Sequence, residues 1–248
     1  MGYHWNWGIF FEQVKGGDET YLDWLITGFG WTLSVSASAW IIALLLGGLI
    51  GTLRTLPVPE HRWVVQAGNV WVEAFRNIPL LVQMFLWFFV VPELLPQDLS
   101  LWVKQDMPAK EFITAMLCLG LFTSARIAEQ VRAGIQSLPR GQSYASLAMG
   151  FSLAQTYRYV LLPMAFRIII PPLTSELMNI FKNSSVAFAI GVLELTFQSR
   201  QMQEDSEQGI ETYLAVTVLY FVCAFIANRG MAMVEKRTQV PGFIAGQH

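Results

Sequence analysis

Five long apolar stretches, separated by shorter polar segments, dominate the hydrophobic pattern of the chain. The first contains no charged residue, and it is longer than the about 20 residues that a helix needs to cross the hydrocarbon core of a bilayer. The pattern therefore predicts an all-α integral membrane protein with a segment at residues 1–24, a transmembrane domain at residues 25–237 and a tail at residues 238–248. The five predicted transmembrane helices cover residues 25–53, 63–91, 112–138, 164–195 and 212–235.

The composition excludes an ordinary soluble enzyme. Of the 248 residues, 54% are hydrophobic and only 14% are charged, against about 25% charged in an average soluble domain. The formal net charge of -2 provides no basic field, so we expect no nucleic-acid partner. The 3 histidines and 2 cysteines are scattered singly, and we therefore expect no metal site, no disulfide framework and no catalytic residues.

Lysine and arginine residues indicate the orientation in the membrane, because they accumulate in short cytoplasmic loops. If the N-terminus lies outside, only Lys15, Lys104, Lys110 and Arg200 fall in outer segments. The inner side then receives most of the 16 basic residues, namely Arg54, Arg62, Arg132, Arg140, Arg158, Arg167, Arg229, Lys236 and Arg237. The distribution predicts an outer N-terminus and an inner C-terminus.

The long inner loop, residues 139–163, is too polar to span the membrane and too apolar to be a disordered linker. We expect a short helix at residues 142–149, closed by Gly150 in the left-handed conformation. Ser152 and Gln155 match a capping box that starts a second helix, and Pro163 allows the next helix to begin in a new direction. The alternative is an amphipathic connector that lies on the membrane surface.

The spacing within this loop resembles a known motif. Gly150, nine residues and then Val160, any residue, Leu162 and Pro163 are similar to the cytoplasmic "EAA" motif of binding-protein-dependent ABC importer permeases. The first three motif positions are here Tyr144, Ala145 and Ser146, so the glutamate is absent. Residues 73–83, 129–142 and 181–185 resemble further stretches of the polar amino acid branch of these permeases. Residues 5–10 and the whole predicted third span look closest to the glutamate/aspartate importers of the histidine/glutamate permease family.

The resemblance implies a type I ABC importer permease fold in the inner membrane of a bacterium, with a periplasmic N-terminus and a cytoplasmic C-terminus. The chain has no phosphate-binding G-x-x-x-x-G-K-[ST] loop, so it binds no cofactor, is not itself an enzyme, and needs ATP and Mg bound on separate ATP-binding-cassette subunits. The other implied partners are a periplasmic amino-acid-binding protein, membrane lipid, and a second homologous permease in a heterodimer, or a second copy in a homodimer. The implied coupling residues are Tyr144, Ala145, Ser146, Gly150, Leu162 and Pro163.

Several charged side chains fall inside the predicted spans, where each costs at least about 2.5 kcal/mol unless it meets a partner or a water-filled cavity. Glu73 and Arg76 are one helical turn apart, as are Glu129 and Arg132, so internal ion pairs are one interpretation. The other interpretation is a substrate pathway, which we predict to contain Arg76, Asn77, Arg126, Glu129, Lys182, Ser184 and Ser185. For Lys182, the alternative to lining a cavity is a buried pair with Glu176.

Arg126 is the most distinctive of these charges, because the resembling family commonly has tyrosine at this position. A guanidinium in a cavity can hold a carboxylate through two parallel hydrogen bonds. We therefore hypothesise that Arg126 selects acidic substrates, glutamate or aspartate, by binding their side-chain carboxylate. The alternative is a purely structural role.

The rival functional interpretation is a self-sufficient secondary transporter or channel in which Glu73, Glu129 and Glu176 carry protons or cations. The absence of an internal sequence repeat weighs against it.

Two sets of backbone features, glycines and prolines, also carry structural expectations. Gly47 and Gly51 allow close helix approach, which we expect within the chain rather than at a dimer contact. Pro79, Pro171 and Pro172 are candidates for bends.

Overall fold

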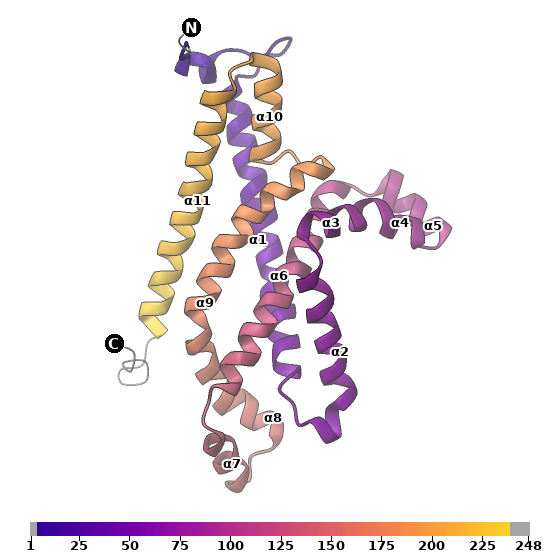
Figure 1. Ribbon diagram of the computed structural model, residues 1–248, viewed down its shortest axis with the longest axis vertical. Coiled ribbons are helices and arrows are strands. Elements are labelled where there is room, and N and C mark those ends of the chain that lie inside the picture. Colours follow the sequence, from indigo (N-terminus) through magenta and orange to yellow (C-terminus); the bar gives the residue numbers. More distant parts are fainter. Residues whose placement is uncertain (1–3, 239–248) are drawn as a thin grey trace. The chain divides into compact units, whose positions relative to one another are not determined.

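The computed structural model describes residues 4–238, and every regular element in that part is helical apart from one isolated bridge between Gln13 and Thr20 (Figure 1). The chain divides into two compact units, each built from three segments. Unit 1 comprises residues 1–40, 78–120 and 179–225, and unit 2 comprises residues 41–77, 121–178 and 226–248. The predicted tail lies outside the described residues except for Thr238.

Unit 1 contains several short helical elements and parts of four long helices. Its core joins Leu25 of α1, Leu195 of α10 and Val216 of α11, and a neighbouring cluster packs Ile9 and Tyr21 against Met202. Figure 1 shows α10 lying beside the beginnings of α1 and α11. The elements with parts in this unit are η1 (Trp7–Phe11), α1 (Tyr21–Leu53), α3 (Leu80–Phe85), η2 (Leu86–Val90), α4 (Val91–Leu94), α5 (Gln97–Leu101), η3 (Trp102–Asp106), α6 (Lys110–Gln136), α9 (Leu162–Asn183), η5 (Ser184–Ile190), α10 (Leu195–Ser206) and α11 (Gly209–Thr238).

Unit 2 holds the remaining parts of α1, α6, α9 and α11 together with α2 (Val58–Asn77), α7 (Arg140–Ala148), α8 (Leu153–Thr156) and η4 (Tyr157–Leu161). Glycines bring α1 and α6 into backbone contact here. A Cβ atom added to Gly47 would lie 2.7 Å from Cβ of Ile127, and one added to Gly51 would lie 2.6 Å from the carbonyl oxygen of Ala128. The expectation that these glycines pack within the chain is confirmed.

The loop at residues 139–163 folds as the expected helix, glycine turn and helix. Gly150 has φ of 88° and closes α7 in a Schellman motif, because its amide donates to Leu147 and the amide of Phe151 donates to the carbonyl of Ser146. The capping box of Ser152 and Gln155 is also present at the start of α8.

The expected change of direction at Pro163 is wrong, because one continuous helical run covers Leu153–Ile190. Proline lacks an amide and its ring would collide with the carbonyl four residues earlier. The π-helical turn η4 directly before it supplies a wider turn, in which the amide of Leu162 donates to Tyr157. Pro163 is therefore accommodated inside a helix, and α9 also continues through Pro171 and Pro172.

Among the described residues, four helices are long and apolar enough to cross a membrane: Tyr21–Leu53, Lys110–Gln136, Leu153–Ile190 and Gly209–Thr238. The expected continuous second span at residues 63–91 is interrupted at Ile78 and Pro79, and it qualifies only if α2 and Leu80–Leu94 are counted as one broken span. Pro79 has extended backbone angles, and the side chain of Gln83 donates to the otherwise free carbonyl of Ile78 at 2.8 Å. The expected fourth span ends five residues early, at Ile190, and Glu194 instead caps the N-terminus of α10.

Candidate functional site

Three arginines surround the carboxylate of Glu129 in unit 2. Nη1 of Arg54 donates to Oε2 of Glu129 at 2.8 Å, and Nη1 of Arg76 lies 3.8 Å from the same oxygen. Arg132 donates to Oε1 through Nε at 3.2 Å and also through Nη2. Nε of Arg54 donates to Oδ1 of Asn69 at 2.8 Å. We call these five residues the Glu129 cluster.

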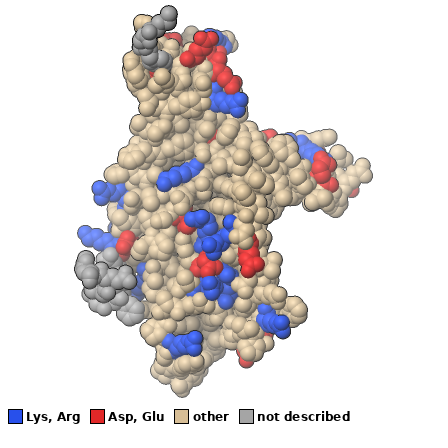
Figure 2. All heavy atoms as spheres, viewed as in Figure 1, with Lys and Arg blue, Asp and Glu red and all other residues tan. Residues whose placement is uncertain are grey.

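The Glu129 cluster carries three positive charges against one negative charge. Its members differ in exposure: the Arg54 side chain is 8% exposed, whereas Arg76 is 49% exposed. Figure 2 shows basic and acidic side chains side by side over α2 and the second half of α6. The buried guanidinium of Arg54 and that of Arg132 are thus held by direct hydrogen bonds to the carboxylate, whereas Arg76 is exposed and lies farther from it.

A second ion pair lies on the α9 side of α6. Nε of Arg126 donates to Oε2 of Glu176 at 2.7 Å, and Nη2 donates to Oε1 at 3.0 Å. Nε2 of Gln130 adds a third hydrogen bond to Oε1 at 2.9 Å. Glu176 is 6% exposed and Arg126 is 42% exposed. We call these three residues the Glu176 cluster.

Helical periodicity explains why the two clusters separate. Arg126 and Gln130 are four residues apart and share a face of α6, and both reach Glu176 of α9. Glu129 and Arg132 are three residues apart on another face, where they meet Arg54 at the end of α1. The predicted ion pair of Glu129 with Arg132 is confirmed.

The predicted pairing of Glu73 with Arg76 is wrong. Glu73 is exposed and forms no ion pair within the part of the chain that the structure describes, whereas Arg76 lies near Glu129. Arg76 stands at the end of α2, next to the break at Pro79, so its long side chain can turn toward α6. Asn77, the last residue of α2, is exposed.

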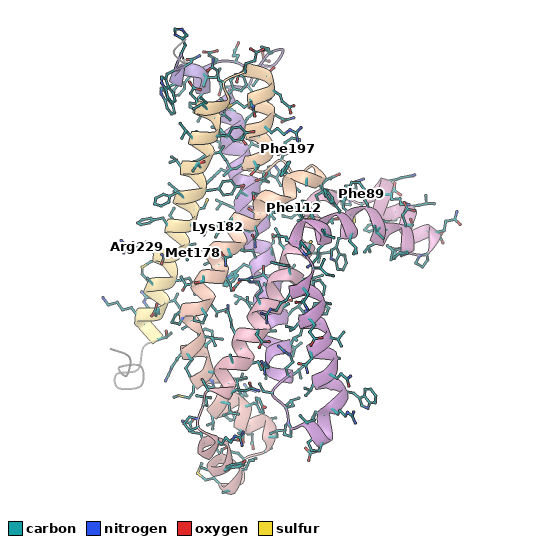
Figure 3. The ribbon with its side chains drawn as sticks, viewed as in Figure 1. Phe89, Phe112, Met178, Lys182, Phe197 and Arg229 are labelled. Atoms are coloured by element: carbon teal, nitrogen blue, oxygen red, sulfur yellow. The ribbon has the colours of Figure 1, made fainter. Side chains whose placement is uncertain are left out.

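The other predicted pathway residues belong to unit 1. Lys182, labelled on α9 in Figure 3, is exposed and has no ion pair among the described residues. The hydroxyl of Ser184 donates to the carbonyl of Phe181, and that of Ser185 donates to the carbonyl of Lys182, each at 2.7 Å. The alternative pair of Lys182 with Glu176 does not form. The carboxylate of Glu176 accepts hydrogen bonds from Arg126 and Gln130 instead.

Sequence reasoning missed three members of the clusters: Arg54, Asn69 and Gln130. Because Arg54 follows the uncharged first span, the sequence predicts that it lies in an inner loop, yet its guanidinium is buried beside Glu129. A signal was available, since a long arginine at a helix end can reach back along the helix to a buried acid. Gln130 could have been found from its four-residue spacing to Arg126.

The predicted coupling residues are distributed over the α7 and α8 pair and the start of α9. Tyr144 is 65% exposed, and Ala145 and Gly150 are also exposed. Ser146 is buried instead, and its hydroxyl donates to Oγ1 of Thr156 at 3.0 Å, which ties α7 to α8. At the start of α9, Leu162 is half-buried and Pro163 is exposed.

Large apolar side chains project from the same segment. Leu147, Met149 and Phe151 are exposed together with Tyr144, although they flank the tight turn at Gly150. No group of three or more histidine, cysteine, aspartate or glutamate side chains suited to a metal ion occurs within residues 4–238. The guanidinium groups of the two clusters can bind anions, because each carries several N–H donors.

Comparison with known proteins finds similarity to permease subunits of import systems. The family model described as "binding-protein-dependent transport system inner membrane component" matches residues 43–240. The glutamate/aspartate import permease protein GltJ of Escherichia coli strain K12 is 47% identical over 249 aligned residues, which cover all of both chains. The glutamate/aspartate import permease protein GltK of E. coli strain CFT073 is 31% identical and covers 88% of this chain and 94% of its own.

Solved structures agree with these relatives. A chain from the crystal structure of an amino acid ABC transporter with histidines superposes with a TM-score of 0.73 and 27% identity, covering 88% of this chain and 95% of that chain. An inward-facing MetNI methionine ABC transporter chain gives a TM-score of 0.74 at 19% identity, covering 88% and 98%, and it shows a shared fold.

Proposed function

Because the chain belongs to the family of binding-protein-dependent transport system inner membrane components, we propose that it is the membrane subunit of an ATP-driven importer of acidic amino acids. The observation that carries this proposal is the 47% identity to GltJ over the full length of both chains. The surplus of arginine in the clusters of unit 2 supports an anionic substrate, since a guanidinium binds a carboxylate through paired hydrogen bonds.

The proposed topology has five spans in a bacterial inner membrane. Four are the single long helices, and the fifth is the broken pair of α2 and Leu80–Leu94. The distribution of basic residues supports a periplasmic N-terminus and a cytoplasmic C-terminus. In this orientation the segment at residues 139–163 faces the cytoplasm.

We further propose that this cytoplasmic segment docks on a separate ATP-binding-cassette subunit that binds ATP and Mg. Its exposed apolar side chains, Tyr144, Leu147, Met149 and Phe151, suit a groove on a partner protein. Ser146 then acts inside the segment, because its hydrogen bond to Thr156 holds α7 against α8. Movement of the ATPase would reach the spans through the continuous helix Leu153–Ile190.

The remaining partners follow from the relatives. Two different permeases, GltJ and GltK, carry the name glutamate/aspartate import permease, and both are similar to this chain. We therefore propose a heterodimer with a second homologous permease, supplied with substrate by a periplasmic binding protein. Within this chain, Arg126 is the proposed recognition residue for the side-chain carboxylate of the substrate, because its guanidinium is partly exposed.

The test is reconstitution of the chain in proteoliposomes with its ATPase, second permease and binding protein. We expect ATP-dependent uptake of aspartate and glutamate in preference to asparagine and glutamine. Arg126→Tyr is expected to remove that preference, whereas the exposed control Arg200→Gln retains it. Uptake by this chain alone, driven by an ion gradient, contradicts the importer proposal, and an unchanged preference in Arg126→Tyr contradicts the role of Arg126.

A further inference from the structure

The guanidinium of Arg126 has two edges, and only one of them is used. Arginine carries five N–H donors in a planar fork, which can hold one carboxylate along the Nε–Nη2 edge and another along the Nη1–Nη2 edge. Glu176 occupies the first edge through Nε and Nη2. Within residues 4–238, Nη1 has no hydrogen-bond partner, and the Arg126 side chain is 42% exposed.

Glu176 is itself firmly held. Its two oxygens accept three hydrogen bonds, two from Arg126 and one from Gln130, and its side chain is 6% exposed. A carboxylate fixed in this way cannot rotate without losing several charge-assisted bonds. The direction of the Arg126 guanidinium is therefore set by a buried group on α9 rather than by the flexible arginine side chain.

We propose that Glu176 is a positioning residue for substrate selection: by holding the Nε–Nη2 edge of Arg126, it presents the Nη1–Nη2 edge to the side-chain carboxylate of an acidic amino acid. This inference rests on the proposed function and adds the group that sets its specificity. A carboxylate accepts both N–H groups of the free edge. A carboxamide offers one oxygen and turns its own NH₂ group toward a donor, so asparagine and glutamine are rejected.

The charge balance supports the same arrangement. Arg126 and Glu176 together are neutral, so an arriving carboxylate meets directed donors without a full uncompensated positive charge. A transport pathway needs binding that is selective and also reversible. Fixed geometry meets both needs, because it lowers the entropy lost by the long arginine side chain without adding net charge.

The experiment compares uptake of aspartate and asparagine by the full reconstituted importer, expressed as the ratio of the two kcat/KM values. In Glu176→Gln we expect the ratio to fall by about 10-fold to 100-fold, the range for loss of a charge-assisted hydrogen bond. Arg126→Lys keeps the positive charge but has no second edge, and we expect a similar fall. The increase in KM for aspartate is expected to exceed any change in kcat.

Two further variants separate positioning from general damage. Gln130→Met keeps the volume of the side chain but removes one hydrogen bond to Glu176, and we expect a smaller fall in the same ratio. Glu73→Gln removes a carboxylate of α2 that has no ion pair among the described residues, and it is expected to leave the ratio unchanged. The Glu176→Asp variant retains the charge and is expected to recover part of the ratio lost in Glu176→Gln.

The outcomes distinguish the inference from the proposed function. If Arg126→Tyr abolishes the preference for aspartate while Glu176→Gln and Arg126→Lys keep it, the positioning role is wrong and the proposed function stands. If Arg126→Tyr keeps the preference, Arg126 is not the recognition residue and the inference fails with it. If Glu176→Gln does not assemble, the ratio in Gln130→Met decides, and an unchanged ratio there overturns the proposal.

Discussion

The contact between α1 and α6 supplies the sharpest stability prediction, because it depends on the absence of two side chains. We consider Gly47→Ala and Gly51→Ala. An added Cβ at Gly47 would lie 2.7 Å from Cβ of Ile127 and 2.8 Å from the carbonyl oxygen of Ser124. At Gly51 it would lie 2.6 Å from the carbonyl oxygen of Ala128. Ordinary contacts of a Cβ atom begin at 3.4 Å.

The expected loss of folding free energy depends on which atoms must move to admit the added methyl group. Each substitution pushes a methyl group into the backbone of α6, which cannot turn aside as a flexible side chain can. Overpacking of this kind costs about 1–3 kcal/mol. Replacing glycine by alanine also gains up to about 1 kcal/mol of helix propensity. Gly48→Ala is the matched control, since it carries the same gain and its Cβ would meet nothing within 4 Å.

The assay is reversible unfolding in mixed detergent micelles, with the free energy of unfolding compared among the three alanine variants. The helix-propensity gain cancels in the comparison with Gly48→Ala. We therefore expect Gly47→Ala and Gly51→Ala to be less stable than Gly48→Ala by about 1–3 kcal/mol each. Equal free energies of unfolding for all three variants would refute the close approach of α1 and α6 at these glycines.

The remaining predictions concern a turn, a buried charge and a half-buried carboxylate. Gly150→Ala is expected to cost about 1–2 kcal/mol, because φ of 88° strains a residue with a Cβ, and to weaken stimulation of the ATPase by substrate-loaded binding protein. Arg54→Met removes a charge-assisted hydrogen bond from Glu129 and is expected to lower the free energy of unfolding by about 1.5–3 kcal/mol in the same micelle assay. The hydrogen bond from Tyr21 lowers the pKa of Asp205 below its ordinary value of 3.8, so this bond stabilises the fold above that pH and is lost as the pH falls through the lowered value. The stability gap between the natural chain and Asp205→Asn, measured by thermal unfolding, is therefore expected to shrink in acid.

Each of these predictions has a control and a contrary result. Gly141→Ala adds a methyl group at another glycine with nothing within 4 Å and without a positive φ, so equal losses at Gly141 and Gly150 contradict the turn argument. A stable Arg54→Met variant shows that the other arginines of the Glu129 cluster suffice to hold the carboxylate. Glu204→Gln alters an exposed surface pair, and a pH dependence equal to that of Asp205→Asn would assign the effect to general surface charge.

The hydrophobic pattern predicted the helical elements well where the chain is regular. Helix α1 begins at Tyr21 and ends at Leu53, against an expectation of residues 25–53, because the charged Asp23 is tolerated in the first turn of the helix. The glycine turn and the capping box were predictable because they are local. The break after α2 was harder to place, since Pro79 indicated only a bend and the extended backbone depends on Gln83 holding the carbonyl of Ile78.

Only part of the candidate site was predictable: the sequence indicates Arg76, Arg126, Glu129 and Arg132, but not Arg54, Asn69 or Gln130, and it indicates few of the contacts. An acid and a base one turn apart on a helix can pair, as Glu129 and Arg132 do. The same rule failed for Glu73 and Arg76, because a tertiary partner on α6 lies within reach of the flexible arginine. The one-turn rule also could not find the partner of Arg126, since Glu176 lies fifty residues away in the sequence.

Burial and pairing together indicate which positive charges remain for a substrate. An arginine removed from water needs a carboxylate close by, and Arg54, at 8% exposure, has Glu129 at 2.8 Å. The exposed guanidinium of Arg76 lies a longer 3.8 Å from the same carboxylate, and Arg126 keeps one edge without a partner within residues 4–238. Water can solvate these two groups until an anion replaces it. The partly exposed guanidinium groups of Arg76 and Arg126 are therefore the ones that a dissolved carboxylate can reach, as an importer of acidic amino acids requires.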